Sequence, residues 1–193
     1  NTINYGDGCY GIEAAAQKYQ RRVLVCLVLR YSPFVRKIRE LIAGGGFGKV
    51  VTVNHTENVG YWHFAHSFVR GNWRNEEEST FMLLAKCCHD LDILVYLIGA
   101  NCSAVSSMGE LSWFYPGNPE KGADFCFECA KKDCPYNAEK FYLANPLWVK
   151  VPALPEEGRE EFIRSWVNRK ENPYARCVYA CDNDVVDHQI VNM

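Results

Sequence analysis

The segment from Met82 to Leu97 constrains the fold most, because it is apolar on nearly every side of a helix and still carries charged groups. Its apolar residues recur at spacings of three and four, which predicts one continuous helix. Lys86 and His89 would share one face, with Asp90 and Asp92 a turn away. A mostly buried helix seldom carries such groups unless they face a cleft. The segment therefore predicts an active-site wall, although a solvated salt bridge is the simpler interpretation of Lys86 with Asp90.

The stretch before this helix adds further groups that can bind a ligand. Four of the five histidines fall between positions 55 and 89. Residues 60–74 mix aromatic and hydrogen-bonding side chains without helical or strand periodicity, which predicts a loop that contacts a polyol or a planar ring. His63 and His66 also have the spacing of two metal ligands, but no third ligand follows at a recognised spacing. The predicted substrate-binding residues are Glu57, Trp62, His63, His66 and Arg70.

Apolar patterning predicts the remaining elements. Residues 23–29 form a continuous apolar run, as in a strand buried on both faces of a parallel sheet. A helix over 34–42 should end at the glycines of 44–48, which form a stop and turn. We also expect a short helix over 12–19, strands over 50–58, 104–114 and 177–191, and a loop-rich region over 116–155.

Several composite motifs resemble one family of oxidoreductases. They are Val28-Leu29-Arg30-Tyr31-Ser32-Pro33-Phe34, His55-Thr56-Glu57-Asn58-Val59-Gly60-Tyr61-Trp62, Gly71-Asn72-Trp73-Arg74 and Cys88-His89-Asp90-Leu91-Asp92. From about residue 12 onward the chain resembles the glucose-fructose oxidoreductase/inositol dehydrogenase/MocA (Gfo/Idh/MocA) family. The resemblance implies an α/β fold, with a C-terminal α+β domain whose open, largely antiparallel sheet is flanked by helices. It also implies NAD or NADP as cofactor and a sugar or cyclitol-like hydroxyl as substrate.

Two departures from the family pattern shape the expected domain organisation. The glycine-rich dinucleotide fingerprint and the family's Glu-Lys-Pro motif are both missing, and residues 1–11 do not resemble the family. We therefore expect residues 1–30 to be a remnant of a dinucleotide-binding Rossmann domain, comprising its last helix and strand. Residues 31–193 would form the substrate-binding and oligomerisation domain, cut off near its end. Ala85 stands where the family usually has an aspartate, so only part of the family's acid/base pair carries over.

The resemblance also implies roles for individual residues. His89 would act as the acid/base, because imidazole titrates near neutral pH, and Lys86 would polarise the same substrate oxygen. Trp73 and Arg74 would lie near the nicotinamide, and Arg30 and Tyr31 near the domain junction. The expected reaction is hydride transfer between nicotinamide and a sugar-like carbinol. Some relatives are glycosidases that use NAD transiently, so glycoside hydrolysis is an alternative, as is a non-catalytic binding or dimerisation module.

Ten cysteines are many for a cytosolic chain, and the cytosol is the compartment that we expect. Cys126, Cys129 and Cys134 lie close together in a polar loop, where thiolates can hold a structural zinc ion. Zinc needs a fourth ligand, which Cys177 or Cys181 could supply; reduced free thiols are the alternative.

Charge and composition narrow the partners. The formal net charge of −2 and the lack of a basic stripe argue against nucleic acid. No apolar run is long enough to span a membrane and no signal peptide is evident, so we expect a cytoplasmic protein with a small-molecule, sugar-like substrate. The family's sheet interface implies a homo-oligomer.

Overall fold

A computed structural model describes residues 5–193 and divides the chain into two compact units. Unit 1 comprises residues 5–55 and 88–101, and unit 2 comprises residues 56–87 and 102–193. Residues 1–4, which belong to the expected Rossmann remnant, lie outside the described part.

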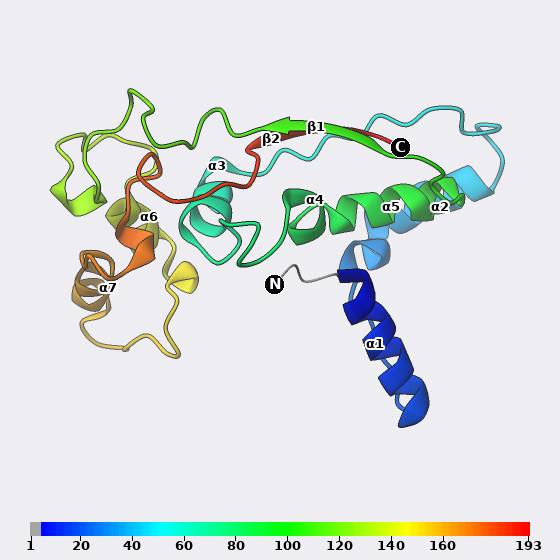
Figure 1. Ribbon diagram of the computed structural model, residues 1–193, viewed down its shortest axis with the longest axis horizontal. Helices are drawn as coiled ribbons and strands as arrows, with labels where there is room; N and C mark the ends of the chain where they lie inside the picture. The colour runs from blue at the N-terminus through cyan, green and yellow to red at the C-terminus, as the bar shows by residue number, and fades with distance from the viewer. Residues whose placement is uncertain (1–4) are drawn as a thin grey trace. The chain divides into compact units, whose positions relative to one another are not determined.

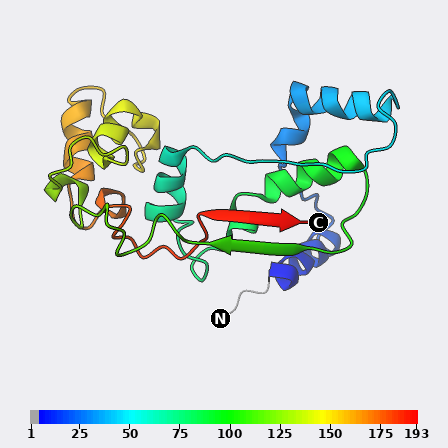
Figure 2. The same ribbon diagram turned by 90° about the horizontal axis from the view of Figure 1, so that it is seen from above.

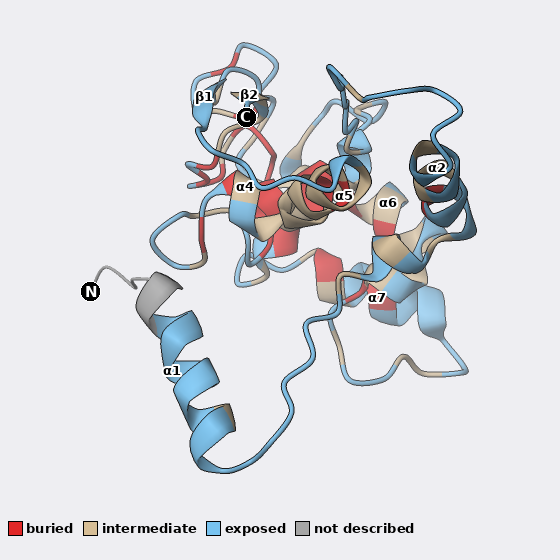
Figure 3. Ribbon diagram, turned by 90° about the vertical axis from the view of Figure 1, so that its right-hand side faces the viewer, coloured by how far each residue is buried: buried red, intermediate tan, exposed pale blue. Residues whose placement is uncertain are grey.

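Unit 1 is built from helices. Helix α1 (Tyr5–Lys18) is longer than the sequence indicates, and from Gly8 to Lys18 all its residues but Ala16 are exposed (Figure 3). Helix α2 (Pro33–Ala43) starts with a proline at its first turn, where the missing N–H costs nothing. It packs against α5 (Cys88–Ile98) and the 3-10 turn η1 (Val28–Tyr31). The predicted helix over 34–42 and the glycine turn that ends it are both confirmed, with Gly45 at a φ of +73°.

The strand expected over 23–29 is wrong. Residues 21–27 have no regular structure, and the segment then enters η1. Val23, Leu24 and Val25 are 57%, 82% and 72% exposed. A strand of this apolar kind is stable only with neighbouring strands on both sides, and none of the described residues provides one here.

Unit 2 contains a helical segment where the sequence predicted a loop. Helix α3 (Tyr61–Phe64) runs directly into one π-helical stretch, η2 (Ala65–Arg70). The prediction of one helix over 82–97 is also wrong, because α4 (Met82–Ala85) ends at Lys86 and α5 begins at Cys88. Lys86 leaves the helical region at a φ of −125°, so Lys86 and His89 do not share a helix face.

The sheet in the described residues has two antiparallel strands, β1 (Ser106–Glu110) and β2 (His188–Asn192), seen side by side in Figure 2. Ser106 pairs with Asn192 and Glu110 with His188. β1 falls inside the strand predicted over 104–114, whereas β2 overlaps only the end of the one predicted over 177–191 and runs one residue past it. The strand predicted over 50–58 is wrong, because these residues have no regular structure. The broad open sheet that the family resemblance implies is not seen in the described residues, which contain only this pair of strands distant in sequence.

Unit 2 has two apolar cores, and its remaining elements contribute to the second of them. These elements are η3 (Cys126–Glu128), α6 (Ala138–Ala144), η4 (Pro146–Trp148), α7 (Arg159–Val167) and η5 (Pro173–Ala175). Helix α6 starts at Asn137, whose side chain accepts a hydrogen bond from the Lys140 N–H, as N-caps do. It packs against α7 (Figure 1).

The first core joins Phe64, Phe68, Val69 and Met82 to the segment that contains Val178 and Val185. The second joins α6 and α7 through Tyr142, Ile163 and Val167, with Tyr174 from η5. Each fully buried aliphatic side chain here stabilises unit 2 by about 1.5–3 kcal/mol. Among the described helices, none combines the length and the apolar character needed to cross a bilayer.

Candidate functional site

The strongest candidate site in unit 2 is an ion pair next to an imidazole. Lys86, in the turn after α4, donates from Nζ to Oε1 of Glu57 at 2.7 Å. Both groups remain partly accessible, with side-chain exposures of 20% and 37%. The charges of both act on His63 in α3, which places the three groups in one neighbourhood. Such a cluster can donate and accept hydrogen bonds to a hydroxylated ligand at once.

The surroundings of His63 favour its neutral form. Burial lowers the pKa of His63, the Lys86 cation lowers it further, and the Glu57 carboxylate opposes them. At neutral pH the imidazole is therefore uncharged, with one nitrogen that donates and one that accepts.

Aromatic rings form one side of this cluster. The Trp62 ring stacks on that of His63 with centroids 5.6 Å apart, and it meets Trp148 edge-on at 5.1 Å. The Phe141 ring also stacks on that of Trp62, with centroids 6.0 Å apart. Trp62 itself is 39% exposed. An exposed indole held rigidly beside polar groups is suited to the apolar face of a sugar or cyclitol ring.

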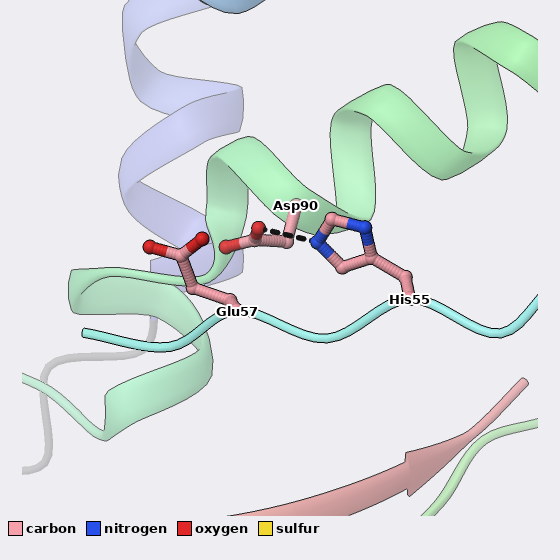
Figure 4. Close-up of side chains that lie close together, drawn as sticks. All are labelled: His55, Glu57 and Asp90. Atoms are coloured by element: carbon pink, nitrogen blue, oxygen red, sulfur yellow. Dashed lines mark hydrogen bonds and ion pairs between the residues drawn. The ribbon is translucent and has the colours of Figure 1, made fainter.

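Unit 1 contains a second pair of chemically capable groups. Nε2 of His55 lies 2.7 Å from Oδ1 of Asp90, as Figure 4 shows. Asp90 is 7% exposed, whereas about a third of the His55 side chain is accessible. A buried carboxylate of this kind fixes the tautomer and orientation of the imidazole.

His89, the expected acid/base, sits in the first turn of α5 in unit 1. Its Nδ1 is buried and lacks a hydrogen-bond partner among the described residues, as does Oδ2 of Asp90. Such orphan atoms cost free energy unless something pairs with them. Asp92, expected beside His89, is instead held by Arg30, whose Nε donates to Oδ2 at 2.6 Å.

His66 and Arg70 lie in the interior of unit 2. His66 is 2% exposed and Arg70 is 3% exposed. The Arg70 guanidinium donates to the carbonyl oxygens of Arg176 and Tyr136, each at 2.7 Å. Their placement supports packing and backbone anchoring, and their predicted contact with substrate stays a prediction.

The residues expected near the cofactor are divided between the units. Arg30 lies over the Tyr96 ring at 5.1 Å while bound to Asp92, and Tyr31 is 64% exposed. In unit 2, Trp73 is 46% exposed, and Arg74 is paired with Glu78 and Asp182.

Two features of these sites, Trp148 and the His55–Asp90 pair, were not predicted from the sequence. Trp148 lies in a region expected to be irregular, and only the density of aromatic residues hinted at a role. The His55–Asp90 pair joins positions far apart in the sequence, so no spacing rule could have found it.

Comparisons with known proteins identify the class. Residues 39–134 match the family model described as "Oxidoreductase family, C-terminal alpha/beta domain" of Gfo/Idh/MocA proteins. The chain is also 34% identical over 131 residues to the putative oxidoreductase YteT of Bacillus subtilis (strain 168). No solved structure matches it.

These matches assign the chain to a family of oxidoreductases. More specifically, it belongs to the Gfo/Idh/MocA family and carries that family's C-terminal α/β domain. The aligned region covers 65% of this chain and 30% of the Bacillus relative, so the chain spans about a third of that relative's length.

Proposed function

We propose that this chain supplies the substrate side of an NAD(P)-dependent oxidoreductase that acts on a hydroxyl of a sugar or cyclitol-like molecule. The observation that carries the proposal is the Lys86–Glu57 pair beside the neutral imidazole of His63 and the exposed indole of Trp62. A polyol needs this combination of charged hydrogen-bonding groups and an apolar platform.

The proposed roles follow from the chemistry of each group. Glu57 accepts hydrogen bonds from ligand hydroxyls, and His63 donates or accepts according to its tautomer. Trp62 contacts the apolar ring face. Lys86 polarises the oxygen of a bound hydroxyl. His89, in unit 1, stays a separate proposal for the proton-transfer group.

The described residues do not fit a dinucleotide by themselves. A pyrophosphate needs a glycine-rich turn that opens a helix, whereas the glycines at 44–48 follow the end of α2. We therefore derive no step through NAD(P) and assign only substrate handling to this chain.

Ligand titration tests the proposal. Calorimetry of the 193-residue chain with glucose, myo-inositol and NAD should show binding of a polyol and none of the dinucleotide. Lys86→Met and Glu57→Gln should weaken polyol binding about tenfold or more, since each removes a charged hydrogen bond. Lys49→Met, which changes an exposed lysine in unit 1, is the control.

Two results would overturn the proposal. Equal polyol affinity in all three variants would show that the cluster is not the binding site. Micromolar binding of NAD to this chain would show that its own residues hold the cofactor.

A further inference from the structure

Four cysteines from separate parts of unit 2 line one small pocket. Cys126 lies in η3, Cys129 and Cys134 lie in the loop that follows, and Cys177 comes after η5. The pocket has a volume of about 20 Å³, enough for one water-sized or ion-sized occupant. Four thiols around a single-atom space match the ligand set of a structural zinc ion.

We propose that Cys126, Cys129, Cys134 and Cys177 bind one Zn²⁺ ion, which ties the 126–134 loop to the segment that follows η5. Of the two candidates for the fourth ligand, Cys177 lines the pocket and Cys181 does not. The Cys181 thiol donates to the Cys177 carbonyl oxygen at 3.2 Å.

The backbone around the thiols is arranged to favour bound thiolates. The Lys131 N–H donates to Sγ of Cys129, two residues earlier, with 3.4 Å between the heavy atoms. Backbone hydrogen bonds from Tyr136 and Tyr179, again two residues on, reach the sulfurs of Cys134 and Cys177. Hydrogen bonds to ligand sulfur are the outer contacts that tune metal–thiolate sites.

Gly122 leaves the space that the Cys129 thiol occupies. A Cβ at Gly122 would lie 2.5 Å from Sγ of Cys129, far closer than atoms can approach. Only glycine at this position lets the Cys129 thiol occupy the pocket.

The charge balance supports the same site. Arg70 is 3% exposed, and no carboxylate lies within ion-pair distance of it among the described residues. Its Nη2 donates to Sγ of Cys126 at 3.3 Å. A buried cation needs an anion nearby. Zinc with four thiolates carries a net charge of about −2, which Arg70 would partly neutralise.

Binding would contract the pocket. No three of these thiols are mutually within 4.8 Å in the described chain, whereas zinc holds its sulfur ligands at about 2.3 Å from the ion. The contraction would also order residues 130–136, which form one side of a larger open hollow of about 560 Å³ next to Trp113 and Tyr179.

Metal analysis of the 193-residue chain, purified without added metal, tests the proposal. We expect about one zinc per chain. Cys177→Ser should reduce zinc to near zero. Cys181→Ser, at the rejected fourth position, and Cys102→Ser, at an exposed thiol far in sequence, should leave the content unchanged.

A second measurement avoids the risk that Cys177→Ser fails to fold. In the unaltered chain, alkylation followed by peptide mass spectrometry should find the four thiols protected together and released together by a chelator. Absence of zinc with four alkylated thiols, disulfides among the four, iron with inorganic sulfide, or full zinc content in Cys177→Ser would each overturn the proposal.

Discussion

Nδ1 of His66 lies 2.7 Å from the hydroxyl of Tyr142, and this hydrogen bond links the two apolar cores of unit 2. His66 belongs to the π-helical turn whose neighbours Phe68 and Val69 fill the first core, whereas Tyr142 lies in the second. The His66 ring also stacks on Tyr174 at 4.7 Å. A histidine that resembles a ligand in the sequence therefore has a structural role in the fold.

Tyr142→Phe should destabilise unit 2 by about 1–3 kcal/mol, because it leaves a buried imidazole nitrogen without a partner. Urea denaturation followed by aromatic fluorescence would measure the change. Tyr10→Phe, at a tyrosine that is 73% exposed, should change nothing. Equal stability of the two variants would show that the His66–Tyr142 bond contributes little.

The same histidine should make stability depend on pH. Burial, with help from Lys150, Arg70 and His63, lowers the pKa of His66 from 6.5 to about 4. The unfolded chain therefore takes up a proton before the folded chain does, so the stabilisation is present above pH 6.5 and is lost as the pH falls towards 4. The loss is about 3 kcal/mol at most. His66→Phe should flatten this part of the stability profile, and an unchanged slope would assign it to other groups.

The sequence predicts correctly those elements that are determined by residues within the element itself. The apolar stripe, the proline start and the glycine end of α2 all lie within that segment, and the prediction holds. The position of β1 is predicted correctly, but the strand predicted over 177–191 pairs only from His188 onward, because the apolar pattern does not show where pairing begins and ends.

The wrong predictions concern segments whose structure depends on residues distant in the sequence. The apolar spacing continues through Lys86 without a break, but the chain leaves the helix there and Lys86 binds Glu57, 29 positions earlier. Helical propensity is only a weak guide where tertiary contacts compete. Residues 61–70 have no single apolar period in the sequence, so they predict a loop. In the structure most of residues 64–70 are buried, and His66 is bound by Tyr142, which is distant in sequence.

Arg70→Lys should destabilise unit 2 by about 2–4 kcal/mol although it keeps the charge. The planar guanidinium reaches the carbonyl oxygens of Tyr136 and Arg176 together, and a single ammonium cannot satisfy both. Thermal unfolding monitored by circular dichroism would report the loss. Arg159→Lys, at an exposed arginine that starts α7, provides the control. A melting temperature for Arg70→Lys that matches the control would argue against this anchoring role.

The two-stranded sheet provides the test of oligomer formation. Met108 pairs directly with Ile190 across the strands, and the two side chains are 71% and 65% exposed. We expect a second copy to cover this apolar pair, as the family resemblance implies. Multi-angle light scattering should find a mass that rises with concentration, and Met108→Lys with Ile190→Lys should give a monomer. A monomeric unaltered chain at high concentration would contradict this expectation.

Kinetics of a form that also carries a dinucleotide-binding domain would decide which group transfers the proton. His89→Ala should lower kcat by about a hundredfold or more with a smaller effect on KM, because an acid/base acts mainly in the transition state. Lys86→Met should behave alike, and Glu57→Gln should mainly raise KM. His55, fixed by the buried Asp90, is the competing candidate. If His55→Ala abolishes turnover while His89→Ala is silent, the proton-transfer group is His55. If Lys86→Met leaves kcat unchanged, Lys86 serves only as the partner of Glu57.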